Sequence, residues 1–316
     1  MKNTVIGKEK ITDVVSKYYN VGAISKCDLI RAGFNHNYLV EAEKGKFVLR
    51  VYLNNKYYIR SEKDFYFELE LLKYLIEQGL PVAKPVSNCE EKLLITHQFG
   101  DQKRSFALFH FAAGTDLRKA KSLDLVKTTD IQKIGVTTAL IHNAADKFKS
   151  PHYRYHLNLS TYLMDKSLQV LESHLEKFGL GDLSFFSSYA EQLREKVEAL
   201  PQSNPFYGLI HADLHGENIF YDVEHGITLI DFDHCAFGWR AYEFATWHGI
   251  EFGLFKEGFE MIRPLSDMEK ELIPTFRILR GIWDCGDILQ FQSLWGEDIE
   301  EGQLKHYVER LKEFVQ

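Results

Sequence analysis

The segment from residue 211 to residue 233, HADLHGENIFYDVEHGITLIDFD, restricts the fold more than any other part of the chain. It carries four aspartates, three histidines and one asparagine around two short apolar runs, 219–221 and 227–230. Short apolar runs bounded by turn residues are typical of buried strands, and residues 224–226 supply a turn between them. The segment therefore predicts a buried hairpin with polar residues gathered at one end.

The spacing of these polar residues indicates what they do together. Asn218 precedes the first arm of the hairpin and Asp231 follows the second, so a closed hairpin brings them side by side. Asp213 projects from the loop just before them. Amide and carboxylate oxygens suit Mg²⁺, and a nearby carboxylate can take a proton from an alcohol. The pattern favours phosphoryl transfer, and the alternative is a polar turn with aspartates at strand ends.

The first third of the chain reads as strands with two helices. Two helices are expected at 8–19 and 61–80, the second stopped by Gly79 and Pro81. Three strands are expected within 25–53, with EKGK as a hairpin turn, and two more at 92–99 and 105–111.

The chain beyond Gly114 is mostly helical. Helical periodicity covers 128–147, 160–177, 183–199 and most of the chain after 240. We therefore expect an α+β protein of two lobes, residues 1–108 and 109–316, joined near 109–114. A ligand cleft is expected between the lobes.

Composition excludes some classes of protein. A net charge of −7 argues against nucleic-acid binding and could attract a cationic small molecule. No run of about 18 apolar residues occurs, and we expect neither a membrane span nor secretion. The four cysteines are far apart, which argues against a zinc site and fits a cytoplasmic protein. The oligomeric state stays open.

A family resemblance rests on His211, Asp213, His215 and Asn218, which form H-x-D-x-H-x-x-N ahead of I-D-F-D. This phrase resembles the catalytic and metal loops of the aminoglycoside phosphotransferase and choline kinase family, small-molecule relatives of protein kinases. The resemblance implies a bilobal protein-kinase-like fold with a β-rich, nucleotide-binding N-lobe and a mostly helical, catalytic C-lobe. It also implies ATP or GTP as donor, Asp213 as catalytic base, and Asn218 and Asp231 as Mg²⁺ ligands.

Weaker matches extend the resemblance into the first third. GFNHNYLVEAEKGKFVLRVY resembles the nucleotide-covering hairpin, with Gly33 and Asn35 near the phosphates. FALFHFAAG resembles the hinge, where the backbone at Phe109 and Phe111 would meet the adenine.

The phosphate-binding pair is also implied by the resemblance, with one departure. Glu68 matches the helix glutamate that orients the phosphate-binding cation, but Arg50 stands where a lysine is usual. Arginine keeps the charge with a different shape. Alternatively, Arg50 and Glu68 form an ordinary surface pair.

Other departures concern the catalytic and metal loops. Ala212 replaces the arginine of protein kinases, Asp233 replaces their glycine, and no A-P-E stretch follows, which argues against a phosphorylation-regulated protein kinase. Asp233 either touches a second metal or holds the loop. His211 is expected to brace the loop, whereas His215 either braces it or touches phosphate or substrate.

The acceptor is less constrained. Trp283, Asp284 and Asp287 on a C-terminal helix could line the acceptor site that the family implies, and the acidic run 296–301 is either a solvated loop or an acidic lip. An amino-bearing antibiotic is the first expectation for the acceptor. A metabolite such as homoserine, choline or a sugar alcohol comes second, and a protein serine third. The alternative from another class is a nucleotide-binding pseudokinase, which only Arg50 supports.

Overall fold

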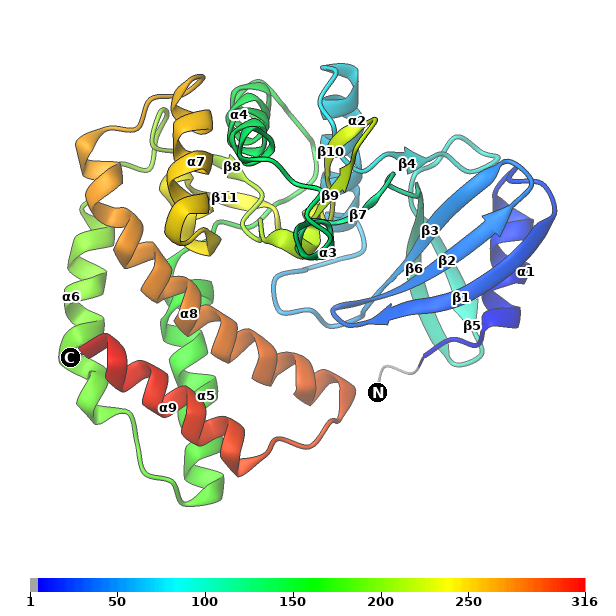
Figure 1. The fold of residues 1–316 in the computed structure, drawn as a ribbon. Helices are drawn as coiled ribbons and strands as arrows, with labels where there is room; N and C mark the ends of the chain where they lie inside the picture. The colour runs from blue at the N-terminus through cyan, green and yellow to red at the C-terminus, as the bar shows by residue number, and fades with distance from the viewer. Residues whose placement is uncertain (1–4, 316) are drawn as a thin grey trace.

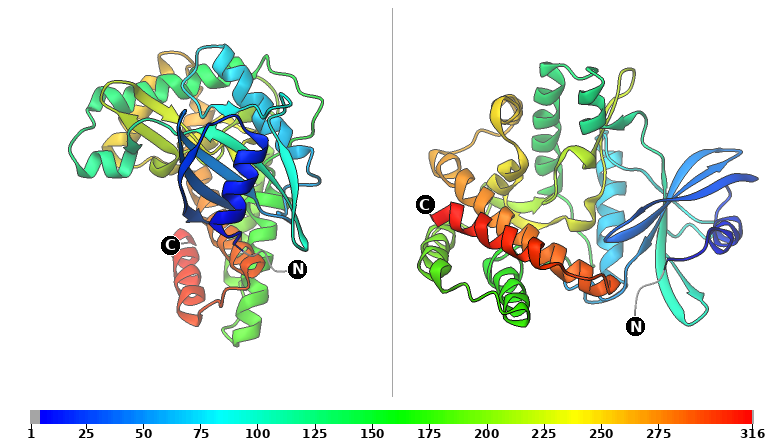
Figure 2. Two further views of the ribbon diagram at one scale, coloured as in Figure 1. Left: turned by 90° about the vertical axis from the view of Figure 1, so that its right-hand side faces the viewer. Right: turned by 60° about the horizontal axis from the view of Figure 1, so that its bottom comes forward.

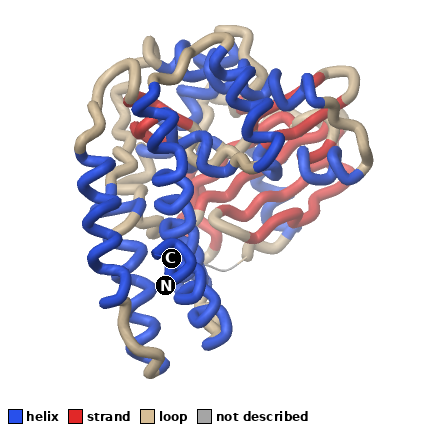
Figure 3. Tube along the Cα trace, turned by 60° about the vertical axis from the view of Figure 1, so that its left-hand side comes forward, coloured by secondary structure: helices blue, strands red, loops and turns tan. Residues whose placement is uncertain are grey.

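The computed structural model describes residues 5–315, which form a β-rich part and a larger helical part (Figure 1). Strands dominate the first 110 residues, and helices dominate the rest, with short strands between them. Figure 3 shows most of the strands gathered on one side of the molecule and most of the helices on the other. This arrangement agrees with the α+β prediction. Within residues 5–315, no helix has both the length and the apolar character that crossing a bilayer needs.

A six-stranded antiparallel sheet forms the N-terminal part, in the order β1-β2-β3-β6-β4 with β5 paired to β6. Helix α1 (Lys8–Tyr18) packs on this sheet (Figure 2), and an apolar cluster that includes Ile11, Leu49 and Phe106 fills the space between them. The predicted EKGK turn joins β2 to β3. The strands are β1 (Ile24–Ala32), β2 (Asn35–Ala42), β3 (Gly45–Tyr52), β4 (Pro85–Val86), β5 (Ile95–Phe99) and β6 (Gln102–His110).

Helix α2 (Asp64–Glu77) is apolar on several sides and is therefore buried nearly all round. It begins at Asp64, slightly later than a Ser61 N-cap would place it, and the Asp64 carboxylate accepts hydrogen bonds from the amides of Arg60 (2.7 Å) and Ser61 (3.3 Å). Its buried residues belong to the same apolar cluster as the C-terminal helices. Glu68 is thus held on a rigid element at the boundary of the two parts.

The C-terminal part is a set of packed helices. Helices α4 and α7 approach closely through Gly135 and Gly258, since a Cβ at Gly258 would lie 1.9 Å from the Gln132 carbonyl oxygen. The helices are α3 (Leu117–Ser122), α4 (Thr128–Ala145), α5 (Asp165–Phe178), α6 (Ser187–Glu198), α7 (Gly249–Glu260), α8 (Asp267–Trp295) and α9 (Glu301–Val315). Short helical turns complete the set at η1 (Leu159–Leu163), η2 (Ser184–Phe186), η3 (Gly216–Asn218), η4 (Phe232–His234) and η5 (Arg240–Thr246).

Helix α8 has 29 residues and is about 44 Å long at 1.5 Å per residue. Ser266 and Glu269 form a capping box at its start, and Gly296, with φ of 68°, ends it in the left-handed conformation. It crosses the helical part and ends beside the sheet (Figure 1). One helix therefore reaches from the core of the C-terminal part to the N-terminal part.

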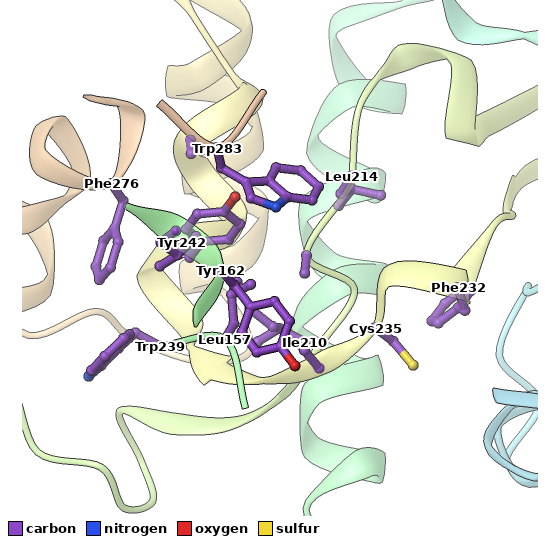
Figure 4. Close-up of a cluster of buried hydrophobic side chains, with 14 of the residues drawn as sticks. Leu157, Tyr162, Ile210, Leu214, Phe232, Cys235, Trp239, Tyr242, Phe276 and Trp283 are labelled. Atoms are coloured by element: carbon purple, nitrogen blue, oxygen red, sulfur yellow. The ribbon is translucent and has the colours of Figure 1, made fainter. Parts of the chain in front are cut away.

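Two small sheets carry the functional segment. One contains β9 (Ile219–Asp222), β10 (Gly226–Leu229) and β7 (Thr115–Asp116), and the other pairs β8 (Tyr207–Ile210) with β11 (Ala236–Trp239). The short strands β7 and β11 were not expected from the sequence. The main apolar cluster packs around these sheets, and Figure 4 shows some of its side chains, including Tyr242 and Phe276.

Candidate active site

The predicted hairpin forms, and its register brings Asn218 and Asp231 together. Ile219 pairs with Leu229 at the end of the β9–β10 ladder, and the Ile230 amide donates to the Asn218 carbonyl at 2.9 Å. Asn218 and Asp231 therefore lie at the same end of the hairpin, just beyond its last paired residues. Both residues line two adjoining cavities.

Asp213 lies in the loop after β8 and is held by three side chains. Arg280 Nη2 donates to its Oδ1 at 2.7 Å, and the Asn218 amide donates to its Oδ2 at 3.1 Å. His215 Nε2 lies 3.6 Å from the same Oδ2. Burial by itself raises the pKa of Asp213, but Arg280 and His215 outweigh it and hold the pKa well below its usual range. Asp213 is therefore ionised at neutral pH, as a proton acceptor must be.

Two residues of the site adopt the left-handed conformation, which costs non-glycine residues energy. The φ angles are 66° at Ala212 and 61° at Asp231. Neighbouring contacts hold the first of them: Glu243 accepts from the amides of His211 and Ala212, and Arg280 donates to the Ala212 carbonyl at 3.1 Å. Strain that the surroundings enforce is concentrated at functional sites in proteins.

Asp233 is buried and holds the loop after the hairpin. Its Oδ2 accepts hydrogen bonds from Lys56, from Tyr58 OH (3.0 Å) and from Asn35 Nδ2 (3.0 Å). Its Oδ1 has no hydrogen-bond partner within residues 5–315. Burial raises and Lys56 lowers the pKa of Asp233, and the net pKa is well below the usual value. Asp233 thus holds the loop through Oδ2, and its contact with a second metal stays a prediction.

Arg50 and Glu68 form a buried pair, which corrects the surface-pair alternative. Arg50 Nη1 donates to Glu68 Oε1 at 2.7 Å, and only 8% and 1% of the two side chains are exposed. Arg50 Nη2 also lies 3.2 Å from Asp231 Oδ1. Burial raises the pKa of Glu68 and the Arg50 charge opposes this rise. One guanidinium therefore connects the sheet, helix α2 and Asp231.

The first cavity, of about 660 Å³, lies between the sheet and the hairpin. Phe109 and Phe111 of the predicted hinge line it, and Val48, Phe220 and Ile230 supply apolar walls. The amide of Phe111 already donates to the Lys46 carbonyl at 3.0 Å. A bound base would therefore need other backbone groups of the hinge, such as those of Ala112, which also lines the cavity.

The turn between β1 and β2, which was expected to lie near the nucleotide phosphates, uses one of its own backbone amides internally. The amide of Gly33 donates to the Asn35 carbonyl at 3.0 Å, so it is used within the turn. The Asn35 side chain accepts from Lys56 at 2.6 Å and donates to Asp233. Gly33 and Asn35 border the second cavity, while Arg31 and Asn37 border both cavities. The turn therefore lies above the junction of the two cavities.

The second cavity, of about 250 Å³, is acidic. Asp213 lies on its wall together with Asp284 and Asp287 from α8. Asp284 accepts from Arg280 at 2.7 Å, and Asp287 accepts from Tyr57 OH at 2.8 Å. The acidic run 296–301 does not line this cavity, which gives no support to the acidic-lip alternative.

The two histidines of the catalytic loop have different surroundings. His211 Nε2 donates to the Ile230 carbonyl at 2.9 Å, and its Nδ1 accepts from the Asp213 amide at 3.3 Å. This bonding ties the loop to the hairpin, as expected. His215 accepts from the Glu217 amide through Nδ1 and keeps Nε2 near Asp213 and Asn218 while bordering the second cavity.

Sequence reasoning missed four residues that hold the site: Lys56, Arg154, Glu243 and Arg280. Arg154 donates to the backbone carbonyls of Cys235 and Asp233. A buried lysine is rare, and nothing local distinguishes Lys56. For Arg280, the spacing of four residues to Asp284 on a predicted helix was an available signal.

No group of three or more His, Cys, Asp or Glu side chains within residues 5–315 is arranged to hold a metal ion. A site that takes only two ligands from the protein would not form such a group. The Asn218 side chain binds Asp213 through its amide nitrogen, and the Asp231 side chain is 26% exposed. The oxygens of this pair suit a hard cation that takes its remaining ligands from phosphates and water.

The profile of a family described as the phosphotransferase enzyme family matches residues 26–254, well over half of the chain. This chain belongs to the phosphotransferase enzyme family. The match contains the β1–β2 turn, the hinge and the 211–233 segment, so the resemblance seen in the sequence is confirmed. The protein is a small-molecule kinase of that family that uses an ATP-type nucleotide and a hydroxyl acceptor.

Comparisons with individual proteins also find kinases. A homoserine kinase from Phenylobacterium zucineum is 27% identical over 255 residues, covering 76% of this chain and 72% of that protein. A microcompartment-associated aminopropanol kinase has a TM-score of 0.75 at 22% identity, over 96% of this chain and 94% of that one. Amicoumacin kinase, solved with AMP-PNP, Ca²⁺ and Ami, has a TM-score of 0.75 at 21% identity, over 98% and 93%. The fold is protein-kinase-like.

Proposed function

We propose that this phosphotransferase moves the γ-phosphoryl group of ATP, with Mg²⁺, onto the hydroxyl of a small molecule that carries an amino group. The observation that carries this proposal is the meeting of two unlike cavities at Asn218 and Asp231. One is large and partly apolar, as a nucleotide base needs, and the other is small and acidic. Asp213 faces the second, where an acceptor hydroxyl would lie.

The first cavity supports ATP as the donor. Phe220 and Ile230 provide apolar surface for the base, and hinge backbone provides its polar partners. Arg50, fixed by Glu68, provides a positive charge next to Asp231. Arginine can pair with two phosphate oxygens at once. Because Arg50 is buried and oriented, its presence gives no support to the pseudokinase alternative.

The residues at the junction fit a magnesium ion, which Asn218 and Asp231 would hold together with phosphate oxygens. Bound there, Mg²⁺ would neutralise charge on the phosphates of the nucleotide. Asp213 accepts the hydrogen bond of the acceptor hydroxyl and orients it. It takes the hydroxyl proton as the bond from the hydroxyl oxygen to the γ-phosphorus forms and the bond to the β-phosphate oxygen breaks, which releases ADP. Arg280, which bridges Asp213 and Asp284, can stabilise negative charge that develops on the transferred group.

The second cavity favours a small, amine-bearing acceptor. Its volume of about 250 Å³ is below the range of roughly 300–1,000 Å³ for sites of drug-sized ligands. Asp284 and Asp287 can bind an ammonium group while Asp213 binds the hydroxyl. Amino alcohols and hydroxy amino acids meet both requirements. An amino-bearing antibiotic stays the second candidate, because the same carboxylates suit it.

The pH dependence of acceptor binding follows from Asp287. Burial raises the pKa of Asp287 to about 8, opposed by the Tyr57 hydrogen bond and assisted by Asp213. A cationic acceptor needs the ionised carboxylate, so binding below that pKa must release a proton. The acceptor KM should therefore fall as pH rises from about 6 to about 8, by up to tenfold per unit, and then level off.

The Asp287→Asn variant provides the control for this pH dependence. Its acceptor KM at pH 8 should be higher than that of the wild-type protein. Between pH 6 and pH 8, the acceptor KM of the variant should fall much less than that of the wild-type protein. Steady-state kinetics at saturating ATP measures both proteins. A KM of the wild-type protein that does not change with pH, or the same slope in the variant, would contradict this role of Asp287.

ATP consumption that depends on the acceptor tests the proposed function. Purified protein with ATP and Mg²⁺ should consume ATP slowly, and faster when amino alcohols are added one class at a time. The matched compounds without the amino group should stimulate less. No stimulation by any hydroxyl compound, in a protein that binds ATP, would count against the kinase and support a nucleotide-binding module.

A further inference from the structure

One face of helix α8 connects the acidic cavity to the β1–β2 turn. Steps of three and four residues place side chains on the same face of a helix. The first three residues of this stripe line the acidic cavity, where Arg280 binds Asp213 and Asp284. The last two contact the turn. The stripe consists of Arg280, Asp284, Asp287, Phe291 and Trp295.

Trp295 contacts the turn in two ways. Its indole Nε1 donates to the Gly33 carbonyl at 3.2 Å, and its ring lies over the His36 imidazole, with 4.4 Å between centroids and 31° between planes. His36 is fully buried, and burial together with Arg104 lowers its pKa to about 4, so the ring is neutral at physiological pH. The last turn of α8 is thus fixed to the first residues of β2.

Phe291 makes a second connection, one turn earlier. Its ring lies 4.4 Å from that of Phe34 at the tip of the turn. Phe34 also contacts the edge of His234 at 5.3 Å, directly after Asp233. Asn35 is bonded to Asp233 as well. The turn therefore has contacts with α8 on one side and with the metal loop on the other.

We propose that Trp295 and Phe291 are positioning residues that hold the β1–β2 turn over the nucleotide phosphates and link it to the acceptor wall of α8. Asp284 and Asp287 precede them by one to three helical turns, so the acceptor wall and the contacts with the turn belong to one continuous helix. This inference rests on the nucleotide site of the proposed function.

The test compares two nucleotides that differ in their phosphates. Titration calorimetry with Mg²⁺ measures the dissociation constants of AMP-PNP and of AMP for the wild-type protein, Trp295→Phe, Trp295→Ala and Leu294→Ala. Trp295→Phe keeps the aromatic ring and loses the hydrogen bond, so its affinity for AMP-PNP should fall about three- to tenfold. Trp295→Ala should lose more than tenfold. AMP, which lacks the β- and γ-phosphates, should bind all four proteins equally well.

Hydrogen exchange provides the structural readout. Trp295→Ala should increase deuterium uptake in residues 31–37 without increasing it in the β9–β10 hairpin, and Leu294→Ala should change neither. Unchanged AMP-PNP affinity in Trp295→Ala would overturn the inference, as would equal losses for AMP and AMP-PNP. A wild-type protein that binds neither nucleotide would instead overturn the proposed function, and the inference with it.

Discussion

Replacing Asp213 by asparagine is expected to lower kcat by about 10²- to 10⁴-fold, the range for removing a general base. The amide has nearly the same size, but it cannot take the proton of the acceptor hydroxyl. Nucleotide affinity should change little, because Asp213 borders the second cavity and not the first. Steady-state kinetics and calorimetric titration with AMP-PNP separate the two effects.

Asp284→Asn is the matched control for this experiment. Asp284 lies on the same cavity wall and also pairs with Arg280. Because it is assigned to the amino group of the acceptor, its loss should mainly raise the acceptor KM. Near-normal turnover in Asp213→Asn, or an equal loss of kcat in both variants, would contradict the assignment of Asp213 as base.

The second large effect is expected for Asp231→Asn. This change removes the negative charge that Asp231 contributes to the proposed magnesium site. The same charge pairs with Arg50. We expect kcat/KM for ATP to fall by about 10³-fold, equivalent to about 4 kcal/mol of transition-state stabilisation. Raising the Mg²⁺ concentration should recover part of the activity, since the remaining ligands still bind the ion weakly. Kinetics across a Mg²⁺ series measures this effect.

Asp222→Asn serves as the control at the opposite end of the same hairpin. Asp222 accepts from the amides of Glu224 and His225 in the β9–β10 turn and borders neither cavity. Its loss should leave the Mg²⁺ dependence unchanged. If Asp231→Asn behaves like Asp222→Asn, then Asp231 does not contribute to metal binding.

The sequence predicted the parts of the site whose residues lie close together along the chain. The β9–β10 hairpin follows from two apolar runs and a turn, so the proximity of Asn218 and Asp231 could be derived from spacing. Arg50 and Glu68 lie on neighbouring elements in the chain, and the sequence left open whether they form a surface pair or serve the nucleotide. The structure shows a buried pair, and the nucleotide role stays a proposal. The burial of the pair depends on the packing of α2 against the C-terminal part.

The missed residues depend on contacts between distant parts of the chain. Lys56 meets Asp233 across 177 positions, and Arg280 meets Asp213 across 67. No local pattern encodes such pairs, because they arise only when the sheet, the hairpin and α8 have been assembled. For the same reason, the contact of Trp295 with Gly33, across 262 positions, could not be predicted from the sequence.

The size of the acidic cavity changes the expected acceptor. From the sequence, an amino-bearing antibiotic came first, on the basis of the family and the net charge. The structure places Asp284 and Asp287 in a cavity of about 250 Å³, with Arg280 filling part of its wall. A compact amine-bearing alcohol fits this space better, so we rank it above the antibiotic.

The most direct test is a phosphorylation screen that is read by mass spectrometry. Wild-type protein and Asp213→Asn are incubated with ATP and Mg²⁺, or with ATP and a chelator, and with pooled amino alcohols, hydroxy amino acids and aminoglycosides. We expect one class of small amine-bearing alcohol to gain the mass of one phosphoryl group, with wild-type protein and Mg²⁺ and in no other arm. Phosphorylation that persists with the chelator or with Asp213→Asn would contradict the proposed site, and a product confined to the aminoglycosides would contradict the small acceptor.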